Sequence, residues 1–147
     1  MEAIVELADF HRRFVEGAPD GLLAVDRNGV IGFWNAGCER IFGYLSAEAI
    51  GKSLDIIIPD RLRARHWQGF AETMRTRVTR YGAGELLSVP ALRKDQTRIS
   101  VEFSIIPFRG KDGTLAGVGA IMRDVTQRFE EMKALRAGAA SAVRQKP

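Results

Sequence analysis

The amino-acid sequence predicts an α+β fold: a five-stranded antiparallel sheet with a helical layer on one face, plus N-terminal and C-terminal flanking helices. Three observations support it. Short apolar runs flank residues 26–29, and the pair Asn28-Gly29 between them is typical of a β-hairpin. Apolar and polar side chains alternate strictly over residues 99–105, as in a strand. Helical patterns fill residues 36–77, between these two β-rich parts.

Periodicity, helix caps and turn residues predict the remaining elements. Ser46 is expected to be the N-cap of one short helix, and Asp60 the N-cap of the longest helix. In chain order the expected elements are a helix at 2–17, strands at 21–26 and 30–35, short helices at 36–43, 46–50 and 54–58, a long helix at 61–77, strands at 85–93, 99–105 and 115–122, and a helix at 127–136. The chain is therefore divided into a helix at 1–17, a domain at 18–126, and a C-terminal helix with a frayed tail at 127–147.

Composition restricts the function. The 147 residues include 22 basic and 18 acidic side chains with no dense basic block, so solvated faces explain the net charge of +4 and no nucleic-acid partner is expected. One cysteine excludes an internal disulfide and any multi-cysteine metal site. No apolar run reaches membrane-span length and no signal peptide is recognised, so a cytoplasmic protein without a membrane partner is predicted.

Catalytic motifs are sparse. The chain has two histidines, and it contains no glycine-rich phosphate loop, no Gly-x-Ser-x-Gly elbow and no His-Glu-x-x-His pair. An enzyme is therefore not predicted.

A set of short motifs, each weak alone, occurs in a fixed order over about residues 14–129. They are Ala18-Pro19-Asp20-Gly21, Asp26-Arg27-Asn28-Gly29-Val30-Ile31, Trp34-Asn35-Ala36, Ile41-Phe42-Gly43-Tyr44, Ala49-Ile50-Gly51-Lys52, Arg93-Lys94-Asp95 and Arg123-Asp124-Val125-Thr126. In this order the chain resembles a PAS domain, with one departure at Gln96, where the family usually has glycine. The resemblance implies a PAS fold and a sensory or dimerisation module that binds haem, flavin, a small organic molecule or nothing.

His66 is the strongest candidate for a functional side chain. Positions 62, 66, 70 and 74 lie on one face of the long helix, so His66 shares a stripe with apolar neighbours. Residues 59–66 are similar to the helix that carries the proximal histidine in FixL-type haem PAS domains. The resemblance implies haem b with His66 as its metal ligand, and Arg61, Arg63 or Arg65 as partners of the propionates. The ordinary alternative is a core histidine satisfied by the backbone, or a half-exposed one beside Trp67.

The distal side of that pocket is expected on the strands. FixL-type domains hold oxygen with an arginine at the position that is Leu87 here, so an apolar distal side is expected, which favours carbon monoxide, nitric oxide or a sixth protein ligand. The other distal positions are Phe103, Ile105, Ile121 and Met122. Alternation leaves open which of Ile121 and Met122 faces inward; Met122 could ligate iron, but packing is favoured.

Two residues invite a flavin interpretation. In light-sensing PAS domains a cysteine forms a flavin adduct, but Leu54 stands at that position here. Cys38 lies on an earlier helix and is expected to be a buried structural thiol. Asn35 is expected to cap the next helix, with a hydrogen bond to flavin as the alternative.

The C-terminal helix carries Phe129, Met132 and Leu135 at spacings of three, with Val125 upstream. Because such a short segment is not stable alone, we expect a homodimer through the flanking helices and a separate signalling effector. The alternative to the haem sensor is a haem-free PAS domain that binds a small ligand or mediates protein interaction and dimerisation.

Overall fold

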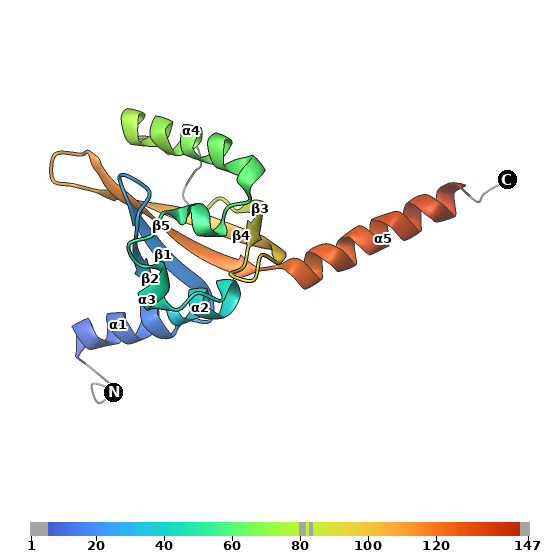
Figure 1. Cartoon of the computed structure of the whole chain (residues 1–147), viewed down its shortest axis with the longest axis horizontal. Helices are drawn as coiled ribbons and strands as arrows, with labels where there is room; N and C mark the ends of the chain where they lie inside the picture. The colour runs from blue at the N-terminus through green and yellow to red at the C-terminus, as the bar shows by residue number, and fades with distance from the viewer. Residues whose placement is uncertain (1–5, 80–81, 83, 145–147) are drawn as a thin grey trace.

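The computed structural model describes residues 6–79, 82 and 84–144, and it confirms the predicted α+β architecture (Figure 1). One five-stranded antiparallel sheet has the strand order β2-β1-β5-β4-β3. The elements are α1 (Leu7–Gly17), β1 (Gly21–Asp26), β2 (Ile31–Trp34), α2 (Ala36–Phe42), α3 (Ser46–Ala49), the 3-10 helix η1 (Leu54–Ile57), α4 (Asp60–Thr76), β3 (Leu87–Leu92), β4 (Arg98–Arg109), β5 (Leu115–Asp124) and α5 (Thr126–Arg144).

The predicted hairpin between β1 and β2 is present. Gly29 has a φ of 76°, which glycine adopts without strain. The Asp26 carboxylate accepts hydrogen bonds from the backbone N–H groups of Asn28 at 2.8 Å and Val30 at 3.0 Å. The local turn chemistry therefore sets the register of the first strand pair.

The core lies between the sheet and the helical layer. Helix α2 packs on β1 and β5, α3 packs on β2, and η1 packs on β3. Trp34, Phe42, Ile31 and Val101 are among the buried side chains. Trp34 Nε1 donates to the Tyr44 carbonyl at 3.0 Å, so the indole is both packed and hydrogen-bonded.

Two predicted helix caps are wrong. Leu45, not Ser46, is the N-cap of α3; Glu48 is therefore its third residue and accepts from the Leu45 backbone N–H at 2.8 Å. Asp60 is the first residue of α4, not its N-cap; its carboxylate forms an ion pair with Arg63 at 2.6 Å.

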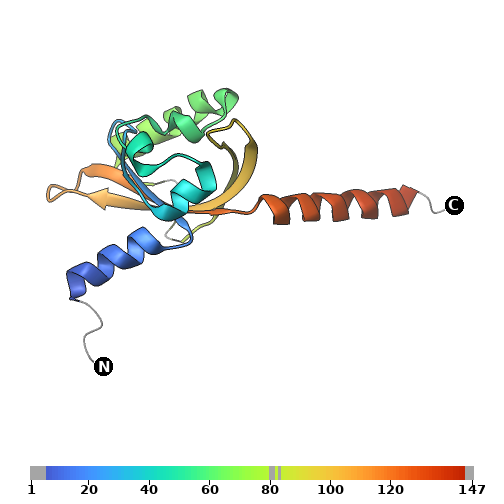
Figure 2. The same ribbon diagram turned by 60° about the horizontal axis from the view of Figure 1, so that its bottom comes forward.

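Helices α1 and α5 both project from the body of the domain (Figure 2). The prediction that the C-terminal helix ends near residue 136 is wrong, because α5 continues to Arg144. Four alanines between residues 137 and 142 have the highest helix propensity, and they outweigh the single glycine among them. Among the residues that the structure describes, none of the helices is both long and apolar enough to span a membrane.

Candidate functional site

The predicted site residues lie on two parts of the fold: helix α4, and strands β3, β4 and β5. The strand register pairs Leu87 with Phe103 and Phe103 with Met122, so these three side chains form one row across the sheet. Ile105 pairs with Ala120 in the neighbouring row on the same face. Met122 is buried, which identifies this face as the inner one.

Ile121 does not belong to this face. Its side chain is 37% exposed, whereas Met122 is 6% exposed. Successive residues of a strand point to opposite faces, so only one of the two can face α4. The expectation that Ile121 lines the pocket is therefore wrong, and Met122 is the inward residue.

Neither of the two facing surfaces is fully covered by the other. On α4, Leu62, His66, Phe70 and Met74 are all half-buried, and the described helix has no fully buried residue. Leu87, Phe103 and Ile105 on the sheet are also half-buried. Both surfaces therefore keep accessible apolar area, which an apolar ligand could cover.

His66 has the properties of an available ligand. Its Nδ1 atom is buried and finds no hydrogen-bond partner among the described residues. Burial lowers the pKa of the imidazole, and the nearby Asp55 carboxylate opposes this only in part, so the ring is neutral at pH 7. The ring stacks on Phe70 with a centroid distance of 6.3 Å and meets the edge of Trp67 at 4.6 Å.

This arrangement fits haem. In the described part of the chain no three His, Cys, Asp or Glu side chains gather into a metal site, so His66 would act as a single protein ligand. A macrocycle supplies the remaining nitrogens, and its iron needs one neutral imidazole in an apolar setting. The partnerless nitrogen and the half-buried apolar walls meet that need.

The three arginines of α4 differ. Arg61 and Arg65 are exposed and form no hydrogen bond or ion pair with any described residue, so both can meet an anionic group. The Arg63 side chain is already hydrogen-bonded within the protein. Its Nε donates to the Ile58 carbonyl at 3.0 Å, and its Nη2 donates to the Asp55 backbone carbonyl at 3.1 Å. Sequence reasoning treated the three as equivalent.

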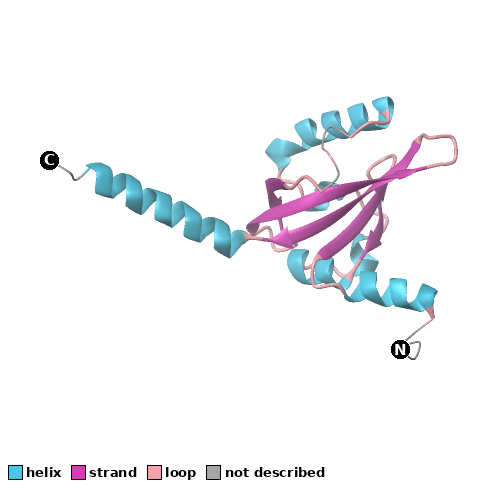
Figure 3. Ribbon diagram, turned by 180° about the vertical axis from the view of Figure 1, so that it is seen from behind, coloured by secondary structure: helices cyan, strands magenta, loops and turns pink. Residues whose placement is uncertain are grey.

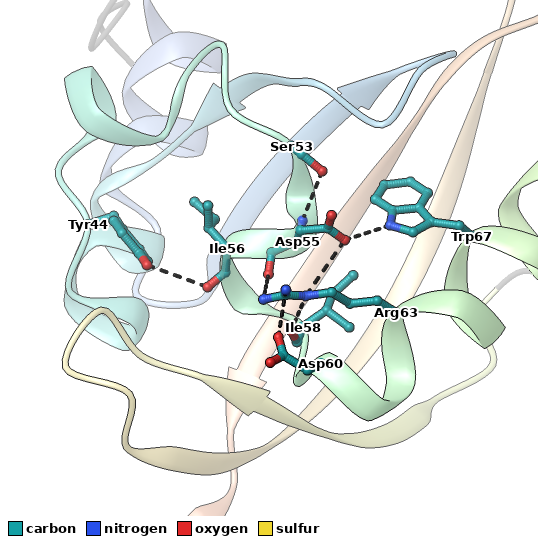
Figure 4. Close-up of polar contacts among 8 residues, drawn as sticks. All are labelled: Tyr44, Ser53, Asp55, Ile56, Ile58, Asp60, Arg63 and Trp67. Atoms are coloured by element: carbon teal, nitrogen blue, oxygen red, sulfur yellow. Dashed lines mark hydrogen bonds and ion pairs between the residues drawn. The ribbon is translucent and has the colours of Figure 1, made fainter.

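Sequence reasoning also missed the contact that holds α4 in place, which we call the Asp55 strap (Asp55, Arg63 and Trp67; Figure 4). Trp67 Nε1 donates to Asp55 Oδ1 at 2.6 Å, and Arg63 Nε lies 3.9 Å from the same oxygen. The Trp67 ring also covers Gly29, where a Cβ would lie 2.2 Å from Cη2. The available signal was the four-residue spacing of Arg63 and Trp67, which places them on one face of the helix.

Cys38 and Asn35 have structural roles. Cys38 is fully buried, and burial raises the pKa of its thiol to about 12, so the thiolate is inaccessible at neutral pH. Asn35 caps α2 as predicted, with its Oδ1 accepting from the Cys38 N–H at 3.0 Å and from the Leu22 N–H at 2.8 Å. Both side chains are used inside the fold.

Two grooves lie elsewhere, beside the start of α5. Their volumes are about 550 Å³ and 430 Å³. Both are lined by Ser88 of β3 and by Phe129 and Lys133 of α5. They lie between the edge of the sheet and α5, the helix that leaves the domain.

Comparisons with known proteins agree with this architecture. The model of the family described as PAS fold matches residues 15–130. Sensor protein FixL of Bradyrhizobium diazoefficiens is 30% identical over 94 residues, which is 64% of this chain and 18% of that protein. The chain thus corresponds to less than a fifth of the length of this relative.

Solved structures show the same fold. The PAS domain of a Colwellia psychrerythraea protein has a TM-score of 0.71 at 20% identity, covering 83% of this chain and 99% of that one. An RNA-binding Light-Oxygen-Voltage receptor also scores 0.71, at 18% identity, with 98% and 41% covered. A sensory box histidine kinase/response regulator from Burkholderia thailandensis scores 0.64 at 18% identity, with 91% and 98% covered.

Proposed function

The chain belongs to the PAS family, and from that premise we propose that it is a sensory domain that holds haem b through His66 and reports a diatomic gas or a redox change to a partner. The observation that carries the proposal is the buried Nδ1 atom of a neutral imidazole without a hydrogen-bond partner among the described residues. This imidazole lies on the half-buried apolar stripe of α4. The similarity to the FixL sensor protein supports the same choice.

Each remaining site residue has a role in this proposal. Arg61 and Arg65, exposed and unpaired within the described part, would meet the propionates. Leu87, Phe103, Ile105 and Met122 would form the apolar wall on the sheet. When bound, the haem iron supplies reversible binding of a diatomic ligand or a one-electron change. Leu87 donates no hydrogen bond, which favours carbon monoxide or nitric oxide over oxygen.

The output is proposed to pass through the start of α5. The Ser100 backbone N–H of β4 donates to Thr126 Oγ1 at 3.0 Å, and the Val125 N–H donates to the Ser100 carbonyl at 2.9 Å. A shift of β4 or β5 would therefore change the direction of α5.

We propose residues 18–126 as the sensor and residues 127–147 as the signalling segment. We further propose a cytoplasmic homodimer through the flanking helices. It acts on a separate effector, with no nucleic-acid or membrane partner.

A haem titration followed by absorbance tests the proposal. Wild type is expected to bind one haem per chain with a strong Soret band, and His66→Ala is expected to lose it. His11→Ala is the matched control, because His11 lies on α1, away from the site, and should leave the band unchanged. An unchanged Soret band in His66→Ala would contradict the role of His66 as the iron ligand. No Soret band in wild type would contradict haem binding itself.

A haem-free interaction module is the second candidate. The grooves of about 550 Å³ and 430 Å³ favour it, because they lie beside the output helix and not beneath α4. Colourless wild-type protein that takes up no haem in the same titration would support this candidate.

A further inference from the structure

The two grooves beside α5 meet at three residues. Ser88 of β3 and Phe129 and Lys133 of α5 line both of them, so the grooves lie side by side along the helix. We call the two together the α5 groove. Figure 3, which views the sheet from behind, shows α5 leaving the ends of the strands with no other described helix beside it. With volumes of about 550 Å³ and 430 Å³, both parts have room for the side chains of a partner.

The α5 groove has an apolar lining that stays open to solvent. Phe129, Met132 and Val89 line it and are 47%, 46% and 40% exposed. Pro90 and Val125 add half-buried apolar surface at its edges. No described residue covers these side chains fully, so a partner that removed them from water would gain free energy in proportion to the apolar area buried.

Four cationic side chains surround this apolar lining. All four are exposed, and none of their side chains forms a hydrogen bond or an ion pair with another described residue; they are Arg98, Arg128, Lys133 and Arg136. Glu102 and Glu130 also line the groove, so four cations and two carboxylates give it a net charge of +2. Unpaired cations around an apolar surface favour a partner that is both apolar and acidic.

The backbone of β3 disfavours an added strand as that partner. The Ser100 N–H donates to Thr126 Oγ1 at 3.0 Å and the Ser100 carbonyl accepts from the Val125 N–H at 2.9 Å, so both groups point away from β3. Pro90 lies opposite Ser100, and its backbone therefore faces the open edge of the sheet. Because proline has no N–H, a strand added at this edge would lack its central donor. The partner must be held through side chains, as a helix in a groove is.

We propose that the α5 groove binds an acidic amphipathic helix of the separate effector, with apolar side chains against Phe129 and Met132 and carboxylates toward the four cations. The proposal rests on the proposed function, in which α5 carries the signal, and it specifies the chemistry of the partner. The lining residues of α5 run from Val125 to Arg136, a rise of about 16 Å, which about three turns of a partner helix match. A second copy of α5 would set cations against cations, and it therefore does not fit this groove.

The apolar and the charged contacts have different roles in this proposal. Exposed ion pairs contribute little each, so the apolar contact supplies most of the affinity. The cations select the sign of the partner's charge and speed the encounter. We therefore expect binding that weakens with added salt and that distinguishes an acidic helix from a basic helix with the same apolar face.

Fluorescence anisotropy with a labelled synthetic peptide tests the proposal on the full chain. The probe is about 18 residues long, with leucine along one face of a helix and glutamate on the other faces. A second probe has lysine in place of every glutamate. Wild type is expected to bind the acidic probe at least ~10-fold more tightly than the basic probe. Raising the salt from about 0.05 M to about 0.5 M is expected to weaken this binding.

Two variants locate the contact. Lys133→Glu reverses a cation that both parts of the groove share, and Ser88→Trp fills both parts from the strand side. Each is expected to weaken binding of the acidic probe at least ~10-fold. Arg144→Glu is the matched control, because it makes the same change of charge at the end of α5, beyond the groove, and should leave binding unchanged. Circular dichroism confirms that each variant is folded.

Several outcomes would overturn this inference. Wild type that binds both probes equally, or neither, would exclude an acidic helix as the partner. Binding lost in Lys133→Glu but kept in Ser88→Trp would assign the contact to α5 alone and exclude the groove. Equal weakening by Lys133→Glu and Arg144→Glu would point to net charge in place of a site.

The assay is independent of haem, so it separates this inference from the haem sensor. Wild type that takes up haem but does not bind the acidic probe would overturn the docking of an acidic helix and leave the haem sensor intact. Wild type that binds the acidic probe in the groove but takes up no haem would support the inference and contradict haem binding alone.

Discussion

Gln96 has a backbone conformation that suits glycine. It lies in the turn between β3 and β4 with a φ of 69°, in the left-handed region that costs a non-glycine residue roughly 1–2 kcal/mol. The backbone N–H of Gln96 donates to the Arg93 carbonyl at 2.9 Å, so the turn is closed despite this strain. The departure from the usual glycine changes the residue and leaves the turn intact.

We therefore expect Gln96→Gly to raise the free energy of unfolding by about 0.5–1 kcal/mol, since relief of strain exceeds the added entropy of the unfolded chain. Chemical denaturation measures the change. Gln96→Ala keeps a Cβ at the same φ and should give no gain. A loss of stability in the glycine variant would contradict the argument from strain.

At the scale of the element, α4 is held to the rest of the domain by contacts at both of its ends. The Asp55 strap joins it to η1, and Trp67 joins it to the hairpin at Gly29. Beyond Phe70 the described helix continues to Thr76 with exposed or half-buried residues only. Arg109 of β4 donates from its Nη1 to the carbonyl of Arg77, the residue that caps the end of α4, at 2.8 Å, so the helix that carries His66 is anchored at both ends.

Asp55→Ala should loosen this anchor, because it removes the acceptor of the Trp67 indole. We expect a loss of about 1–2 kcal/mol of stability and faster amide hydrogen exchange across α4. Asp60→Ala is the control, since it removes only the exposed ion pair with Arg63. Equal exchange of α4 in the two variants would show that the strap does not anchor the helix.

At the scale of the whole molecule, one ion pair joins the roots of both flanking helices. Asp20 lies between α1 and β1, and Arg123 is the second-last residue of β5, three positions before α5 begins. The pair lowers the pKa of Asp20, with the Arg123 hydrogen bonds as the first cause. Because the Arg123 side chain is largely exposed, the pair orients the helices more than it stabilises the fold.

Arg123→Gln is expected to change the unfolding midpoint little and to weaken the proposed self-association through the flanking helices, because the segment that joins α1 to β1 loses its ion pair with β5. Sedimentation and denaturation on the same samples separate the two effects. Arg12→Gln makes the same charge change within α1, where Arg12 pairs with Asp9, and should leave self-association unchanged. Equal weakening by both variants would point to net charge instead.

Local signals determined much of the fold. The Asn-Gly turn requires φ above zero and set the first hairpin, while alternation at residues 99–105 set the central strand. The 3.6-residue period placed His66 on the half-buried stripe of α4. Each of these features depends on neighbours within a few positions, so the chain alone was enough to predict them.

Neighbouring residues in the sequence did not reveal which of Ile121 and Met122 faces inward. Both side chains are apolar although Met122 faces the core and Ile121 lies on the exposed outer face of the sheet, so no alternation remains in the sequence there. The Asp55 strap and the Asp20–Arg123 pair could not be predicted from the sequence for a related reason. Asp20 and Arg123 are 103 positions apart, and only the pairing of β1 with β5 brings them together. The sequence alone was enough to predict the elements and their order; the tertiary structure decided which face of β5 is inward and which polar groups meet, since both depend on strand order.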